Sequence, residues 1–102
     1  MKYRVELADS FTDDLDRHLA YLVQENVSPV TIGRWLGRLH ELVMGLDELP
    51  KRHPVDPHFT QRTGIATRKV NLGNYLIFYQ VDENHRRVDV IAFTHGASRN
   101  DV

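Results

Sequence analysis

The chain has 102 residues, of which 41% are hydrophobic and 26% are charged, and this composition predicts one globular domain over residues 1–102. Its 13 basic and 14 acidic residues give a net charge of −1, which excludes a polycation, and the lack of cysteine excludes disulfides and thiolate chemistry. The charged, alternating residues 1–7 do not resemble a signal peptide, and no apolar run approaches the roughly 20 residues of a membrane span. We therefore expect a cytoplasmic protein.

The charges are unevenly distributed along the chain. Residues 1–50 carry five basic and nine acidic side chains, whereas residues 51–102 carry eight basic and five acidic ones. The second half also holds four of the six histidines. It is therefore the better candidate for contact with an anionic partner or nucleic acid, the alternative being a dipolar domain without such a partner.

A strand and then a helix are expected at the start of the chain. Residues 2–7 alternate polar and apolar side chains, which is typical of a half-buried strand. Ser10 with Asp13 resembles a capping box that opens a helix ending near Glu25 and Asn26. One face of this helix is apolar, formed by Phe11, Leu15, Leu19 and Leu22.

A second helix is expected from Ser28-Pro29 to Pro50, which makes a helical hairpin with the first. Its apolar seam is formed by Ile32, Leu36, Leu39, Val43 and Leu46. Gly33 and Gly37 lie one turn apart inside it, which suggests either close approach of another element or simple tolerance. Trp35 lies beside the seam, where it is either a core residue or a contact for a partner.

Residues 51–65 contain two prolines and little periodicity, so we expect a surface loop that is functional or mobile. Within it, His53, Asp56 and His58 fall in six residues, but no third anchor or supporting hydrogen-bond partner can be named for a metal. We interpret them as solvated loop residues and predict no metal site.

Three strands with period two complete the chain. They are expected at 66–72, 75–81 and 87–93, joined by a Gly73-Asn74 turn of type II′ and by a turn at 82–85, and followed by a polar tail over 94–102. The run 75–81 is apolar on both faces and should be central in its sheet. The order predicts an α+β fold (β-α-α-β-β-β) in which a helical hairpin packs on one face of a three-stranded antiparallel sheet.

No nucleotide-loop, metalloprotease or nucleophile-elbow motif occurs in the sequence, and no cofactor is expected. Arg68 is informative because alternation places it on the apolar face of its strand, where an unpaired guanidinium is costly. It either pairs with a carboxylate of the helical hairpin or faces a groove and contacts a partner. Lys69 projects from the opposite face and is expected to be exposed.

His95 and Arg99 follow the last expected strand, around Gly96, which allows a sharp exit. Groups at a sheet end often bind ligands, so both residues are candidates for contact with a partner. His95 could act as a general base, but the sequence does not identify a second catalytic group.

Several strings, in this order and at this length, resemble the RelE/ParE toxin superfamily, on the ParE side, over nearly the whole chain. They are Ala8-Asp9 after the first strand, Asp14-Leu15, Ser28-Pro29, the run Leu46 to Pro50, Arg68 before the turn, the run Tyr75 to Val81, and His95-Gly96. The resemblance implies a toxin of a bacterial type II toxin–antitoxin module, neutralised by a cognate antitoxin, with a homodimer or a toxin–antitoxin hetero-oligomer as the assembly.

ParE-like members of this superfamily poison DNA gyrase, and RelE-like members cut mRNA on the ribosome. Against the nuclease pattern, Lys69 matches a strand-borne lysine, Leu76 stands where the nuclease has an arginine, and Ala97-Ser98 replaces most of a basic cluster. The resemblance thus implies a gyrase inhibitor that is not an enzyme. The alternatives are an mRNA endonuclease using Lys69, His95 and Arg99, or a non-toxic binding module with the same fold. The residues expected to contact a partner or target are Trp35, Arg68, Lys69, His95 and Arg99.

Overall fold

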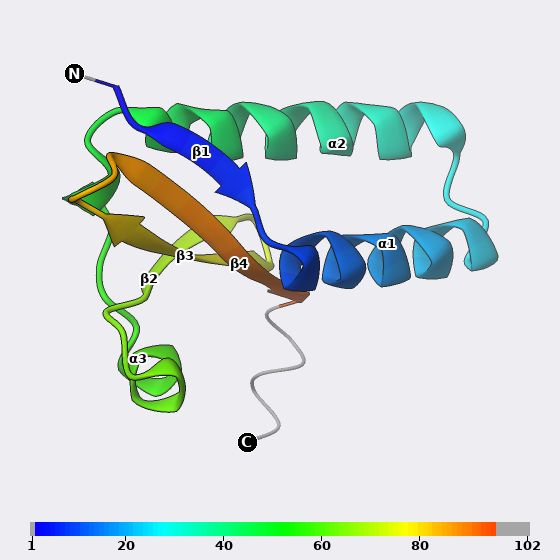
Figure 1. Cartoon of the computed structure of the whole chain (residues 1–102). Helices are drawn as coiled ribbons and strands as arrows, with labels where there is room; N and C mark the ends of the chain where they lie inside the picture. Colours follow the sequence, from blue (N-terminus) through cyan, green and yellow to red (C-terminus); the bar gives the residue numbers. More distant parts are fainter. Residues whose placement is uncertain (1, 96–102) are drawn as a thin grey trace.

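The computed structural model describes residues 2–95. In chain order its elements are β1 (Arg4–Leu7), α1 (Asp9–Gln24), α2 (Pro29–Met44), the single 3₁₀ turns η1 (Gly45–Asp47) and η2 (Pro50–Arg52), α3 (Pro57–Thr63), β2 (Arg68–Leu72), β3 (Tyr75–Asp82) and β4 (Arg87–His95). The two long helices run antiparallel beside the sheet, and α3 lies apart from them (Figure 1). This confirms the expected α+β fold and its helical hairpin.

The sheet has four strands, in the order β1-β4-β3-β2, and not the expected three. β1 is the additional strand and pairs in parallel with β4, whereas the other neighbours are antiparallel. β3 is an inner strand, as its apolar residues on both faces predicted. The first and last strands of the described chain are therefore direct neighbours.

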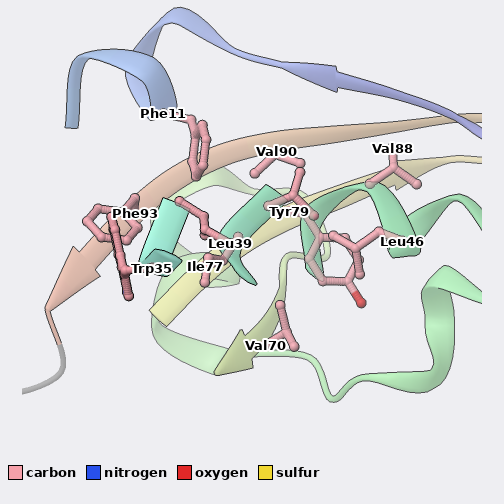
Figure 2. Packing of buried hydrophobic residues seen from close by; sticks show 11 residues of the cluster. Phe11, Trp35, Leu39, Leu46, Val70, Ile77, Tyr79, Val88, Val90 and Phe93 are labelled. Atoms are coloured by element: carbon pink, nitrogen blue, oxygen red, sulfur yellow. The ribbon is translucent and has the colours of Figure 1, made fainter. Parts of the chain in front are cut away.

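The hydrophobic core lies between the sheet and the helical hairpin. Its members include Phe11 of α1 and four residues of α2 and η1 that are at most 8% exposed: Trp35, Leu39, Val43 and Leu46. Trp35 is therefore the first buried residue of α2, whereas Leu36 of the predicted seam is only partly buried. In Figure 2, Trp35 and Phe93 lie together at one end of the core and Tyr79 and Leu46 at the other. We call the sheet face that meets this core the helix face, and the opposite face the far face.

The prediction of a loop over residues 51–65 is wrong, because the segment contains η2 and the helix α3. Asp56 caps α3 by accepting a hydrogen bond from the Phe59 amide at 2.9 Å, and Pro57 is at the first helical position. Gly64 ends the helix with φ of +76°, in the left-handed region that glycine tolerates. Local capping signals therefore specify a helix in a segment that lacks apolar periodicity.

Element ends also differ in places from the predictions. The Ser10 side chain does not cap α1 but donates to the Ile91 carbonyl, so the helix starts at Asp9 without a side-chain cap. β2 starts at Arg68, and β4 continues through Thr94 and His95, which were expected in the tail. By contrast, Ser28 caps α2 as predicted, accepting from the Thr31 amide at 3.1 Å.

No other element packs closely on the two glycines inside α2 in the described part of the chain. A Cβ built on Gly33 or Gly37 would meet no atom within 4 Å, so the expected close approach is wrong for the described part of the chain. In residues 2–95, no helix has both the length and the apolar character that crossing a bilayer demands.

Candidate functional site

Arg68 lies at the start of β2, opposite Tyr79, on the helix face. Its Nη1 atom donates to two backbone carbonyls, that of Lys51 at 3.1 Å and that of His53 at 2.7 Å. The predicted carboxylate partner from the helical hairpin is therefore wrong, because backbone carbonyls of the segment before α3 take that role. The side chain is only partly buried, so its contact with a partner stays a prediction.

Lys69 points to the far face, opposite Phe78. It is less exposed than predicted: its Nζ lies 3.9 Å from a carboxylate oxygen of Asp56, and its side chain is 33% exposed. Asp56 is itself only 4% exposed. The pair ties the cap of α3 to the sheet.

His95 belongs to a cluster of rings at the end of β4. Its ring centroid lies 5.0 Å from that of Tyr75 and 6.3 Å from that of His18, with the two imidazoles only 14° from parallel. His18 Nε2 and the Tyr75 hydroxyl are 3.1 Å apart and share a hydrogen bond. Burial, and secondarily the nearby His95, lower the pKa of His18, so its neutral form is favoured.

Trp35 packs against this cluster from α2, with its ring 4.9 Å from Tyr75 and 5.8 Å from Phe93. It is 8% exposed and belongs to the core, which was one of the two predicted roles. Its indole N–H is buried and has no hydrogen-bond acceptor in the described residues. A contact between Trp35 and a partner stays a prediction.

The residues of the predicted nuclease set do not meet in the described structure. Lys69 is on the far face beside α3, whereas His95 packs with Tyr75 and His18 on the helix face. A β-bulge causes this separation, because Phe78 pairs with Ala92 but Tyr79 pairs with Val90, which leaves an extra residue in β4. Strict alternation from Val90 would have turned His95 to the far face. Arg99 lies outside the described residues.

The group His53, Asp56 and His58 does not form a metal site in the described structure. Within residues 2–95, no three His, Cys, Asp or Glu side chains are placed to hold a metal ion. His53 lies edge-on to Tyr79 at 6.3 Å. The Tyr79 hydroxyl donates to the Pro50 carbonyl, and burial raises the pKa of Tyr79 to about 12. These groups are therefore neutral structural contacts near neutral pH.

An apolar groove of about 320 Å³ lies between the two long helices. Its walls are formed by Leu7, Phe11, Leu15, Leu36, Leu39, His40, Val43 and Met44. Leu7 and Met44 are 48% and 44% exposed, which is high for apolar side chains of this size. The groove can accept apolar side chains of another chain.

Sequence reasoning missed His18 and the residues around α3. His18 lies three residues after Leu15 on the apolar face of α1, and a polar residue on such a face is a usable signal. Asp56-Pro57 followed by Gly64 was the signal for α3. Arg62 and Phe59 of this helix, 4.9 Å apart, became visible only with the helix itself.

Comparison of the chain with known protein families and solved structures agrees with this architecture. Residues 5–99 match the family model described as the ParE toxin of the type II toxin–antitoxin system parDE. A solved structure, the toxin–antitoxin complex RelBE2 from Mycobacterium tuberculosis, is similar in fold, with a TM-score of 0.62, 22% identity, and coverage of 93% of this chain and 92% of that one. No curated protein matches the chain. Because the family model spans almost the whole sequence, the chain belongs to the ParE toxin family of type II toxin–antitoxin systems.

Proposed function

We propose that the protein is a toxin that inhibits DNA gyrase without itself being an enzyme. The observation that carries this proposal is the separation of Lys69 and His95 on opposite faces of the sheet. Cleavage of RNA needs cations and an acid–base pair around one phosphate. A protein inhibitor needs only a surface that fits its target, and family membership supports a toxin of this kind.

We also propose that a cognate antitoxin neutralises the toxin by filling the groove between α1 and α2. The exposed Leu7 and Met44 at this groove suit an amphipathic antitoxin segment with regularly spaced apolar side chains. The similar RelBE2 structure is itself a toxin–antitoxin complex, which supports a protein partner for this fold. The resulting assembly is a toxin–antitoxin hetero-oligomer.

The test is expression of the chain from an inducible promoter, alone and together with the product of the neighbouring gene. Gyrase inhibition predicts growth arrest with a DNA-damage response, and purified gyrase incubated with the toxin should retain broken DNA after protein denaturation. Co-expression of the antitoxin should restore growth. Arrest of translation with cut mRNA and intact DNA would instead establish an endonuclease, and absence of any growth defect would establish a binding module.

A further inference from the structure

Two hollows lie along the junction of α1 with the end of β4. One has a volume of about 280 Å³ and faces α3, and the other has about 290 Å³ and faces the C-terminal half of α1. They adjoin one another, because Asp14, Phe93 and Thr94 line both. We call the combined feature the β4 trough. It shares no lining residue with the apolar groove.

A ladder of rings forms one end of the β4 trough. Tyr21 stacks on His18 at 6.0 Å with an angle of 29°, and His18 stacks on His95 at 6.3 Å with an angle of 14°. Tyr21 is 55% exposed, so much of its ring remains open to solvent. Three planar rings in near-parallel orientation provide a stacking surface for another flat ring.

A second stack forms the other end, on α3. Phe59 stacks on the buried Phe78 with ring centroids 4.2 Å apart. The guanidinium of Arg62 lies 4.9 Å from the centre of the Phe59 ring. The buried contact fixes Phe59 in place, and the planar cation over its ring can both stack on a base and contact a phosphate.

The charges of the trough favour an anionic ligand. The cations that line it are Arg17 and Arg62, and the imidazoles of His18, His58 and His95 add hydrogen-bonding groups, against the single carboxylate of Asp14. Both oxygens of that carboxylate are engaged: one accepts from Arg17, and the other accepts from the Phe93 amide at 3.2 Å. Arg62 has no acidic partner within residues 2–95.

From these observations we infer that the β4 trough binds a short segment of single-stranded nucleic acid. Two separated stacking surfaces, with the guanidiniums of Arg62 and Arg17 lining the hollows beside them, are what unpaired bases and their phosphates require. A duplex would hide its base faces, and an acidic peptide would leave both ring stacks unused. This inference does not depend on gyrase inhibition, because nucleic-acid binding is measured with the toxin in the absence of gyrase.

The experiment is fluorescence anisotropy with the full-length chain and labelled oligo-dT and oligo-U of about 12 nucleotides, within the range that single-strand binding modules occupy. Binding should weaken as salt increases, because phosphates are being neutralised. Arg62→Ala and Tyr21→Ala, both at exposed positions, should each weaken binding about fivefold or more. Binding of one oligonucleotide type alone assigns the site to DNA or to RNA.

Arg38→Ala is the matched control, since Arg38 is exposed on α2 outside the trough and carries the same charge. It should change affinity by less than about twofold, the range of a distant surface substitution. The inference is overturned if the unaltered protein does not bind at low salt, if Arg38→Ala weakens binding as much as Arg62→Ala, or if a duplex binds as tightly as the single strands. Displacement by a glutamate-rich peptide as effective as displacement by unlabelled oligonucleotide would also overturn it. Circular dichroism of each variant verifies that the fold is retained.

Discussion

Arg68 shows how one side chain joins two parts of this chain. Its hydrogen bonds to the carbonyls of Lys51 and His53 hold the segment that leads into α3 against β2. Arg68→Ala removes two charge-assisted hydrogen bonds and leaves both carbonyls without that donor. We expect a loss of about 1–3 kcal/mol in the free energy of unfolding, measured by chemical denaturation.

The matched control for this substitution is again Arg38→Ala, which should stay within about 0.5 kcal/mol of the unaltered protein. A variant of Arg68 that keeps full stability but no longer arrests growth would contradict a structural role. It would instead assign the guanidinium to contact with the target.

Gly33 and Gly37 carry the second prediction at this scale. Both are exposed in the interior of α2, and an added Cβ would meet nothing within 4 Å. Gly33→Ala and Gly37→Ala should therefore each raise the free energy of unfolding by about 0.5–1 kcal/mol, because alanine loses less backbone entropy in a helix. The midpoint of urea denaturation measures the gain. A decrease that depends on protein concentration would reveal a close contact between copies of the chain on this face.

At the scale of elements, the ring cluster connects α1, α2 and the sheet through a titratable residue. The pKa of His18 is lowered, chiefly by burial, so its contribution to stability is complete above the unfolded-state pKa of about 6.5 and is lost as the pH falls through the folded-state value. Burial and, secondarily, Arg52 also lower the pKa of His53, so its contribution to stability is likewise lost as the pH falls.

The melting temperature should therefore be level between about pH 8 and 7 and should fall below about pH 6.5. His18→Gln should flatten part of this fall, and His53→Gln another part, whatever the absolute stability of each variant. The lowered pKa values of Asp82 and Glu83 act in a separate, more acidic range. If the melting temperature of both variants fell as steeply as that of the unaltered protein, the assignment to His18 and His53 would be contradicted.

The apolar groove between α1 and α2 gives the second prediction for elements. Met44 is 44% exposed at its wall, so Met44→Glu should leave the toxin folded. A charge there should weaken antitoxin binding about tenfold or more, because the bound antitoxin would bury it against apolar side chains, as titration calorimetry would measure. Val30→Glu, at the other end of α2 and 69% exposed, is the control and should bind normally. Equal affinities for the two variants would locate the antitoxin elsewhere.

For the whole molecule, periodicity was sufficient to predict the helical hairpin and the three C-terminal strands. Local patterns do not encode which strand edges meet, so the parallel pairing of β1 with β4 was not predicted. The helix α3 was missed because its segment lacks apolar periodicity and only its capping residues mark it in the sequence. Part of its support is tertiary, since Phe59 rests on Phe78, which is 19 positions further along the chain.

The candidate site was only partly predictable for a similar reason. Arg68 could be selected because a cation on an apolar face needs a partner, but backbone carbonyls have no sequence signature. The β-bulge in β4 also has no recognisable sequence pattern, and it determines which face of the sheet His95 occupies. The sequence was therefore sufficient to select the candidate residues but not to predict which groups they contact.

The pairing of β1 with β4 has a consequence for the order in which the nascent chain can fold. β1 is made first, but the only strand it pairs with in the described sheet is made last, after all the other helices and strands. Contacts that span so much of the chain form late, and until then the apolar residues of β1 lack their neighbour. We therefore expect the toxin to reach its native shape only when translation of β4 is finished, so that an antitoxin already present can meet it at that moment.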